Sequence, residues 1–448
     1  MVAKLFVERP EAGLRALLVF SSSVESNLAT LEELEELVLS AGLDTVAVIT
    51  NPRKIPHPKS LVGSGKLQEI CLEAEQSDAG IIVFSEDLSP SQEKNIEQAA
   101  GRRVMGRTGL ILEIFAQRAR THEGKLQVEL AQLQHAASRL VRGWTHLDRQ
   151  RGGSGKGQGA SAGLSGDGET QLEADQRQLR ARTKKVNQRL AKVQRQRGQN
   201  RKARQRSQTP SVALAGYTNS GKSTLFNALS DAKVHAADQL FATLDPTLRQ
   251  IPLPLTGKMI LSDTVGFIRA LPHTLIEAFK ATLEEVTHAA LILHVVDAAA
   301  PEKQERIDAV NNVLSEIGAQ QIPQLLVLNK ADLVTTDQPV IRRDSSGKPV
   351  SVCVSALCGE GLNAMLNCID ELLGSELVET TVSLKPEQGM IRAKCYDMGC
   401  VIREITHDDG VINLYLRIEK HSLEKLNSAL MQSYTMHNHE INGKIDNR

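Results

Sequence analysis

The sequence predicts an α/β protein of several domains, and three observations support this. Short apolar runs alternate with amphipathic helical stretches over residues 14–104 and again over 211–373, which is the pattern of parallel strands joined by helices. Between these regions, two long stretches carry apolar residues at helical spacing. After residue 376 the apolar runs, such as GMIRAKCY (389–396), become short and strand-like, which predicts a small α+β domain over 376–448.

Length and composition predict a globular protein with its own hydrophobic core. The chain has 448 residues, which suits about three domains at roughly 150 residues each. Its 41% hydrophobic and 24% charged residues exclude disorder throughout the chain. No stretch approaches the roughly 18 apolar residues of a membrane span, and Glu8 and Pro10 interrupt the start before the apolar core of a signal peptide can form. We therefore expect a cytoplasmic protein without a membrane span. The sequence leaves the oligomeric state open, with a monomer as the default.

The six cysteines favour structural thiols over a metal site. Cys353 and Cys358, and likewise Cys395 and Cys400, are separated by four residues but have no nearby His to complete a zinc site. We therefore expect reduced cysteines.

Residues 1–115 are predicted to form an N-terminal α/β domain with a mostly parallel sheet. Gly63, Ser64, Gly65 and Lys66 stand just before one of its predicted helices. This motif could bind a phosphate at the start of the helix, or it could only cap the helix. Because the motif is short, we favour the cap.

Residues 116–208 are predicted to form a long antiparallel helical hairpin. Apolar residues recur at steps of three and four in the first helix and every seven in the second, so neither helix can bury its stripe alone. Between the helices, eight of the seventeen residues over 152–168 are Gly, which predicts a flexible tip. Trp144 could stack on an RNA base or fill the last layer of the stripe, and its spacing favours packing. The stripes consist of Leu126, Leu130, Leu133, Ala137, Leu140 and Trp144 in the first helix and of Leu172, Leu179, Val186, Leu190 and Val193 in the second.

The second helix of the hairpin is strongly basic. Lys plus Arg (53) balance Asp plus Glu (53) over the whole chain, but residues 177–206 hold thirteen basic side chains and no acidic one. A run of like charges repels itself unless a polyanion lies nearby, so we predict that this helix binds RNA with an affinity that falls as salt rises. The alternative is a coiled-coil face that only keeps the protein soluble, although such a face normally mixes both signs.

Residues 209–375 are predicted to form a doubly wound α/β domain with six strands and a parallel sheet. Directly after its first strand, residues 216–223 fit the pattern G-x-x-x-x-G-K-[ST] of a phosphate loop. The glycines let backbone N–H groups close on the phosphates, Lys222 supplies charge, and the Ser223 hydroxyl can bind Mg²⁺. The predicted nucleotide-binding residues here are Gly216, Tyr217, Thr218, Asn219, Ser220, Gly221, Lys222, Ser223 and Thr224.

Further short motifs follow the phosphate loop, and the last three stand at the carboxyl ends of apolar strands, where open α/β sheets bind their ligands. The carboxylate of Asp332 can accept two N–H bonds from guanine, whereas adenine would present an acceptor there. The residues therefore predict a GTP site rather than an ATP site. The candidates in these motifs are Phe241, Ala242, Thr243, Leu244, Asp245, Asp263, Thr264, Val265, Gly266, Asn329, Lys330, Ala331, Asp332, Ser355, Ala356 and Leu357.

These motifs resemble those of the translation-factor-like P-loop GTPases, and their exact sequences are similar to those of the HflX family. The matching stretches are LFATLDPT (240–247), DTVGF (263–267), NKAD (329–332) and GETQLEAD (168–175). The resemblance covers nearly the whole chain, although the Gly-rich stretch is longer than in the family and lacks its Arg-Gly-Pro. It implies a GTPase that binds the large ribosomal subunit and its RNA and splits ribosomes, notably those stalled after heat or other stress.

The resemblance also implies a magnesium site. Ser223 and Thr243 would bind Mg²⁺, and Asp263 would hold the ion through water. GTP would then order both switch segments, and hydrolysis would release them. An alternative for Thr243 is a residue that merely caps a turn, with Thr247 as a competing ligand.

By the same resemblance, Lys222, Thr243 and Gly266 are the predicted catalytic residues, with the Gly266 N–H meeting the γ-phosphate. Phe267 follows, where Ras-type GTPases carry the Gln that orients the attacking water, and a phenyl ring cannot do that. We therefore expect slow hydrolysis alone and strong stimulation by ribosomes. Asn219 occupies the place where potassium-activated relatives help to hold K⁺, although it could instead bond only within the loop.

Together, these features predict a GTP-dependent ribosome-splitting factor. One alternative is an anti-association or assembly factor that binds the large subunit and in which the nucleotide is mainly structural. Another is a GTPase switch for a protein partner that binds the hairpin.

Overall fold

A computed structural model describes residues 13–21, 27–52, 56–151, 171–206, 209–230, 240–254, 257–269, 272, 280–334, 340–374, 377–397, 400–407, 410–419 and 426. They form two compact units. The first comprises Met1–Gln194, His235–Pro246 and Val265–Leu283, and the second comprises Arg195–Val234, Thr247–Thr264 and Glu284–Arg448. The predicted flexible tip at 152–168 lies outside the described residues. The predicted boundaries at 1–115, 116–208, 209–375 and 376–448 stay predictions.

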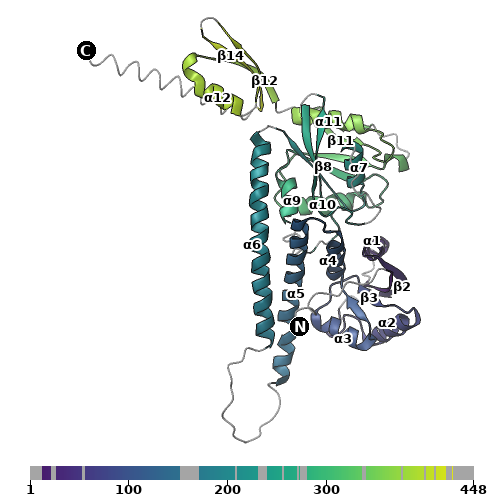
Figure 1. The fold of residues 1–448 in the computed structure, drawn as a ribbon. Coiled ribbons are helices and arrows are strands. Elements are labelled where there is room, and N and C mark those ends of the chain that lie inside the picture. Colours follow the sequence, from purple (N-terminus) through teal and green to yellow (C-terminus); the bar gives the residue numbers. More distant parts are fainter. Residues whose placement is uncertain are drawn as a thin grey trace, which may run out of the picture. The chain divides into compact units, whose positions relative to one another are not determined.

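In the first unit, the described residues up to Arg118 form a four-stranded sheet and four helices (Figure 1). They are β1 (Leu14–Ser21), α1 (Asn27–Ser40), β2 (Leu43–Asn51), α2 (Ser64–Gln76), β3 (Ile81–Phe84), α3 (Pro90–Ala100), β4 (Arg103–Met105) and α4 (Arg107–Arg118). The strand order is β2-β1-β3-β4, and every pair is parallel. Leu17 and Val19 of β1 pack with Ile82 and Phe84 of β3 in one core. The predicted parallel sheet is confirmed.

The helical hairpin consists of α5 (His122–Arg151) and α6 (Gln171–Arg206). Their stripes share one core, and Arg182 of α6 forms an ion pair with Glu129 of α5 at 2.8 Å. This confirms the predicted packing for seven stripe residues, whereas Val193 is half-buried and is not among the residues of this core. The core residues are Leu126, Leu130, Leu133, Ala137, Leu179, Val186 and Leu190. The side chains of Leu140, Trp144 and Leu172 lie outside the described set.

The second unit is built on a seven-stranded sheet. Its elements are β5 (Ser211–Gly216), α7 (Lys222–Ser230), β6 (Thr247–Leu253), β7 (Gly257–Asp263), α9 (Lys280–Thr287, which begins in the first unit), β8 (Leu291–Asp297), α10 (Lys303–Glu316), β9 (Gln324–Asn329), η2 (Ala331–Leu333, a 3₁₀ turn), β10 (Ile341–Arg343), β11 (Pro349–Cys353) and α11 (Leu362–Gly374). The strand order is β10-β11-β9-β8-β5-β7-β6. The five central strands are parallel as predicted, but the prediction of six strands is wrong, because β6 and β10 add antiparallel edges.

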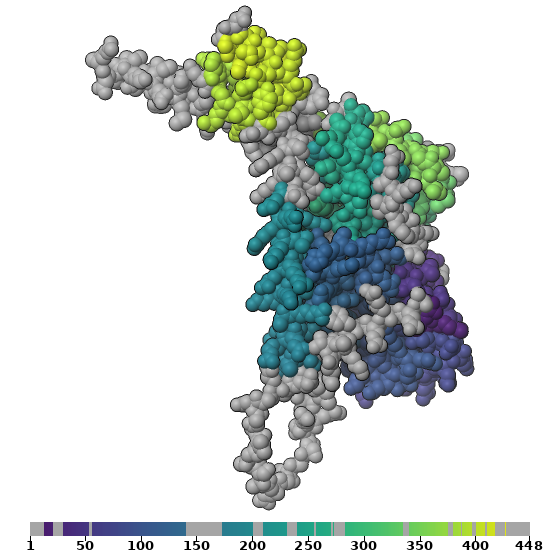
Figure 2. Space-filling view, viewed as in Figure 1, coloured from purple at the N-terminus to yellow at the C-terminus, as the bar shows by residue number. Residues whose placement is uncertain are grey.

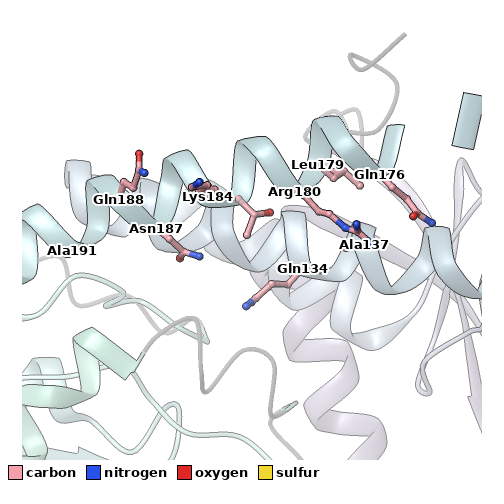
Figure 3. A pocket seen from close by; sticks show the side chains of 10 residues that line it. Gln134, Ala137, Gln176, Leu179, Arg180, Lys184, Asn187, Gln188 and Ala191 are labelled. Atoms are coloured by element: carbon pink, nitrogen blue, oxygen red, sulfur yellow. The ribbon is translucent and has the colours of Figure 1, made fainter. Parts of the chain in front are cut away.

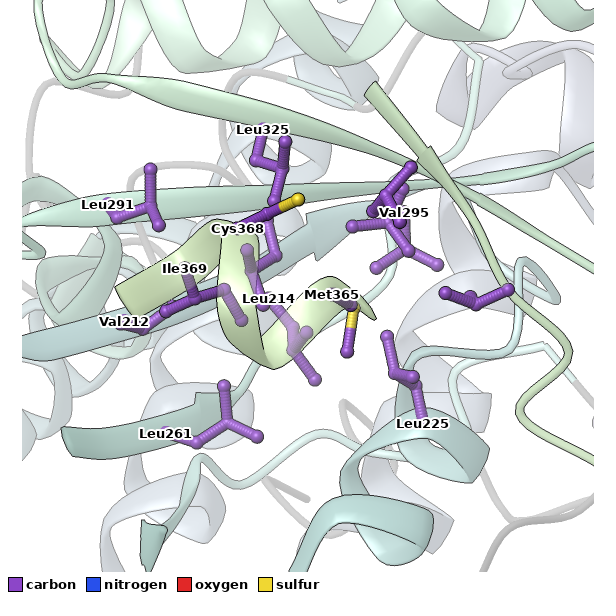
Figure 4. Packing of buried hydrophobic residues seen from close by; sticks show 14 of the residues in the cluster. Val212, Leu214, Leu225, Leu261, Leu291, Val295, Leu325, Met365, Cys368 and Ile369 are labelled. Carbon is purple, nitrogen blue, oxygen red and sulfur yellow. The ribbon is translucent and has the colours of Figure 1, made fainter. Parts of the chain in front are cut away.

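The edge strands escaped the sequence analysis because they are half exposed and lack an apolar run. Residues of β6 alternate between exposed and buried toward its end, as expected for an edge paired in a hairpin. The central strands are buried under helices, and Figure 4 shows Met365 and Ile369 of α11 lying over Val212 and Leu214 of β5. This core holds the loops at the carboxyl ends of the parallel strands.

The second unit ends in a small antiparallel sheet with one helix. Its elements are β12 (Leu377–Leu384), η3 (Pro386–Gln388), α12 (Gly389–Asp397), β13 (Val401–Thr406) and β14 (Ile412–Glu419), with the strand order β12-β14-β13. The α+β prediction holds, but the run GMIRAKCY is helical rather than a strand. Its apolar residues Ile391 and Cys395 are four apart and both buried, which is a helical period. The sequence also predicts a helix that starts at Ser422, but apart from residue 426 this stretch lies outside the described residues.

All six cysteines are free. Among the described helices, none is both long enough and apolar enough to cross a membrane.

Candidate nucleotide-binding site

The phosphate loop, residues 216–223, connects β5 to α7. A Cβ added at Gly216 would overlap the carbonyl oxygen of Val295. Gly221 has φ +88°, and a Cβ there would overlap the side-chain nitrogen of Asn329. Only glycine fits both positions, so the turn depends on β8 and β9 as well as on its own sequence.

Asn329 joins two other loops of the site. Its Nδ2 donates a hydrogen bond to the Ser220 carbonyl oxygen at 2.9 Å, and its Oδ1 accepts one from the Ala356 N–H at 3.0 Å. The side chain is buried, so both bonds are made away from water. The first residue of the predicted base-binding motif therefore also holds the phosphate loop in place.

Lys222 is buried at the start of α7. Its Nζ donates to the Tyr217 carbonyl oxygen at 2.7 Å. Burial lowers the pKa of Lys222 to about 8, and the nearby carboxylate of Asp263 opposes this shift. The hydroxyls of Thr218 and Ser220 are buried in the same loop and have no hydrogen-bond partner among the described residues. A buried ammonium and two buried donors fit an anion such as a polyphosphate.

Ser223 and Asp263 meet directly. The Ser223 hydroxyl donates to Asp263 Oδ2 at 2.7 Å, and Asp263, at the end of β7, is fully buried. A hydroxyl and a carboxylate placed together are oxygen ligands of the kind that Mg²⁺ prefers. These residues therefore fit the ion, and the roles of Ser223 as a direct ligand and of Asp263 as a holder through water stay predictions.

The predicted base-binding residues lie on β9, η2 and the loop after β11. The Ser355 hydroxyl donates to Asp332 Oδ1 at 2.5 Å, yet Asp332 stays exposed, as a group that contacts a base must be. Lys330, with φ +62°, forms an ion pair with Asp297 at 2.8 Å. The Ser355 hydroxyl thus helps to orient the Asp332 carboxylate.

Other predicted residues have structural contacts. The Thr264 hydroxyl donates to the Leu214 carbonyl oxygen at 2.6 Å inside the sheet. The guanidinium of Arg306 lies over the ring of Tyr217, 5.2 Å from its centroid. Asn219 has φ +59°, a left-handed conformation that Asn tolerates. These contacts fix the walls of the loop.

The two predicted switch segments contain the motifs at 241–245 and 263–266. Most of their residues belong to a different unit from the phosphate loop. Residues 240–246 and 265–269 belong to the first unit, whereas the phosphate loop, Asp263, Asn329, Asp332 and Ser355 belong to the second. Within the first unit, Phe241 and Thr243 are buried, and Asp245 is hydrogen-bonded to the start of α5. Their roles toward a nucleotide stay predictions. The sequence analysis missed the partners of these residues, although Gly124 in the first turn of α5, a poor helix former, was a signal.

A groove runs between α5 and α6 in the first unit, and its volume is about 670 Å³. Figure 3 shows Gln134 and Ala137 of α5 on one side and Arg180 and Lys184 of α6 on the other. The space-filling view shows α6 lying along α5, with its side chains forming a continuous strip of surface (Figure 2). Basic residues therefore border an open groove on the hairpin.

A largely parallel sheet with a phosphate loop, a paired serine and aspartate, and an Asn-Lys-Ala-Asp motif defines a P-loop GTPase. Family models agree along the chain. Residues 29–116 match "GTP-binding GTPase N-terminal", 118–204 "GTP-binding GTPase Middle Region", 211–330 "50S ribosome-binding GTPase" and 340–440 "HflX C-terminal domain".

Similar proteins cover nearly the whole chain. The GTPase HflX of Escherichia coli (strain K12) is 50% identical over 412 residues, which is 92% of this chain and 95% of the relative. The GTPase HflX of Magnetococcus marinus is 42% identical over 396 residues, or 88% of this chain and 89% of the relative. A crystal structure of the SsGBP and GDP complex is 25% identical, covers 81% of this chain and 99% of its own, and has a TM-score of 0.46. The chain belongs to the HflX family of GTPases.

Proposed function

We propose that this GTPase binds the large ribosomal subunit in its GTP state, splits ribosomes, and is released when GTP is hydrolysed. The observation that carries the proposal is the buried Lys222 beside the Ser223–Asp263 pair, in a domain that matches a "50S ribosome-binding GTPase" model. Lys222 holds the phosphates, Ser223 and Thr243 hold Mg²⁺, and Asp332 reads guanine. A ribosomal partner and six free cysteines suit a cytoplasmic protein, which we expect to be monomeric.

The test is sedimentation of intact ribosomes with the full chain. GTP and a non-hydrolysable analogue should both produce free subunits, and GDP should not. If all three nucleotides give the same profile, the protein is an anti-association or assembly factor in which the nucleotide is mainly structural.

Hydrolysis should depend on the partner. Phe267 stands at the position where Ras-type enzymes carry a Gln that orients the attacking water. Its phenyl ring is buried and has no polar atom that could orient a water molecule. We therefore expect slow hydrolysis by the protein alone and much faster hydrolysis with large subunits. Equal rates in a phosphate-release assay would contradict this.

A potassium ion is a candidate for the missing charge. Asn219 occupies the fourth position of the phosphate loop, and a cation beside the phosphates would stabilise the transition state as an arginine finger does elsewhere. Turnover should then be faster in potassium than in sodium salts. Identical rates would mean that Asn219 bonds only within the loop.

The basic helix α6 supplies the RNA-binding surface in this proposal. Lys185, Arg189 and Lys192 are exposed, while the apolar stripe of the same helix is buried against α5. Replacing Arg195, Arg197, Arg201 and Arg204 with Gln should weaken ribosome binding and flatten its dependence on salt, by about 0.9 in log–log slope for each phosphate that is no longer neutralised. GTP affinity, measured in parallel, distinguishes weaker RNA binding from a folding defect. An unchanged slope would remove the helix from the interface.

A further inference from the structure

The first predicted switch segment, taken as residues 240–246, is half-buried at Ala242, Asp245 and Pro246 and buried at its other positions. The N–H of Leu240 donates to the Ser40 hydroxyl at 2.9 Å. The rings of Phe241 and Phe115 meet edge to face, with their centroids 4.7 Å apart. Leu240, Phe241 and Leu244 are each at most 3% exposed. This segment is therefore held by contacts with α1 and α4.

Asp245 adds a polar anchor at the first turn of α5. Its Oδ2 accepts hydrogen bonds from the backbone N–H groups of Arg120 and Thr121 at 2.9 and 2.8 Å, and its Oδ1 accepts one from the Thr121 hydroxyl. The Thr121 hydroxyl in turn accepts from the Gly124 N–H at 2.9 Å, as an N-cap residue does. A carboxylate at a helix N-terminus also interacts favourably with the helix dipole. The switch segment thus supplies part of the cap of the hairpin's first helix.

Gly124 makes room for this anchor. It lies in the first turn of α5 with ordinary helical geometry, so its backbone does not require glycine. A Cβ added there would overlap Asp245 Oδ1 and come within 3.2 Å of the Thr121 hydroxyl. Glycine is a poor helix former, and the space for Asp245 explains its presence.

We infer that Asp245 is a positioning residue that holds Thr243 ready for the GTP state. Thr243 is two residues away, so its Cα lies within about 7 Å of that of Asp245 along the chain. Ordering a loop on binding lowers affinity, and a loop already ordered avoids this loss. GDP has no γ-phosphate, and Thr243 is proposed to bind magnesium only in the GTP state. The anchor should therefore strengthen binding of GTP more than binding of GDP. The inference rests on the proposed role of Thr243 as a magnesium ligand.

The test compares variants of the full chain, with affinities for GDP and for a non-hydrolysable GTP analogue measured by fluorescence. Gly124→Ala expels the Asp245 carboxylate and should weaken binding of the analogue about tenfold, while GDP affinity stays within about twofold. Gly65→Ala is the matched control, because Gly65 lies in the first turn of α2 and has nothing within 4 Å of the added Cβ. It should change neither affinity.

A double-mutant cycle shows whether Gly124 acts through Asp245. Asp245→Ala should also weaken the analogue about tenfold, and the double variant should be no weaker than either single one, because both remove the same anchor. Asp245→Asn keeps one acceptor oxygen and should recover part of the loss. Additive effects, equal losses for both nucleotides, no change, or tighter binding of the analogue would each overturn the inference.

Thr243→Ala separates the inference from the proposed function. If this change leaves the preference for GTP over GDP intact, the magnesium role of Thr243 fails. If Thr243→Ala removes the preference for GTP over GDP but Gly124→Ala leaves it unchanged, the magnesium role of Thr243 stands and only the proposed role of Asp245 as an anchor is wrong.

Discussion

The chain contains two short runs of Ser-Gly-Lys at the start of a helix in an α/β fold, and the structure builds them differently. In the first, Gly63 is the N-cap of α2 with φ −67°, Gly65 has open space beside it, and Lys66 forms an ion pair with Glu69 at 2.8 Å. This agrees with the cap that the sequence favoured.

In the second run, the same residue types form a closely packed loop around a buried lysine. Gly221 has φ +88° and is pressed against Asn329, and Lys222 is buried and bonded to the Tyr217 carbonyl oxygen. The difference shows that a phosphate loop depends on the strands that surround it. Neighbouring strands at the second run leave no room for a Cβ and bury the lysine, whereas at the first run no described atom lies within 4 Å of a Cβ added at Gly65 and Lys66 is only half-buried.

Removing each lysine should give the largest contrast. Lys222→Ala should lower affinity for both GTP and GDP by at least about a hundredfold, because it removes several charged hydrogen bonds to phosphate. Lys66→Ala should leave both affinities within about twofold, because Lys66 bonds to its own helix. Isothermal titration of the two variants measures this. A comparable loss in Lys66→Ala would mean that both runs contact the same nucleotide.

Adding a methyl group to each glycine should give a smaller contrast. In Gly221→Ala the backbone is strained and the new Cβ displaces the Asn329 amide, so we expect GDP affinity to fall at least about tenfold. Gly65→Ala should leave GDP affinity unchanged and raise the melting temperature slightly, since Ala is the better helix former. Normal GDP binding by Gly221→Ala would show that the loop can open without Asn329.

Removing magnesium should reveal a further difference between the two runs, in how much GTP binding depends on the serine of each. Chelation should weaken GTP binding about tenfold in the unaltered protein, because Ser223 would hold an ion that supplies positive charge to the phosphates. The same treatment of Ser223→Ala should have little further effect, whereas Ser64→Ala at the first run should respond like the unaltered protein. An equal response of both variants to chelation would remove Ser223 as a ligand.

The pH dependence of binding should give the smallest effect. The pKa of Lys222 is lowered to about 8 by burial, so the free protein loses this charge as pH rises through that value, and a phosphate ligand favours the charged form. Affinity for GDP should therefore fall as pH rises, by about fourfold between about pH 7.0 and about 8.5. Fluorescence titrations at several pH values check the sign, and an affinity that rises with pH would contradict it.

Most of the fold was predictable because its signals are local. The parallel strands are apolar runs, and the stripes of the hairpin from Leu126 and Leu179 onward repeat at helical spacing. The edge strands β6 and β10 were missed because one-sided exposure leaves few apolar residues, and α12 was misread because a short apolar run fits either period. The residues of the phosphate loop were predictable because their chemistry and spacing are contained in eight consecutive positions, 216–223.

The sequence by itself determined the class of site, since glycines, a lysine and a serine at fixed spacing can only be combined in a few ways that bind phosphates. Only the tertiary structure decided what holds the switch segment. Asp245 meets Thr121, which lies 124 residues earlier in the chain, and no local pattern records a contact over that separation. Packing between distant segments depends on the arrangement of whole elements, so the need for glycine at position 124 becomes visible only when Asp245 lies beside it.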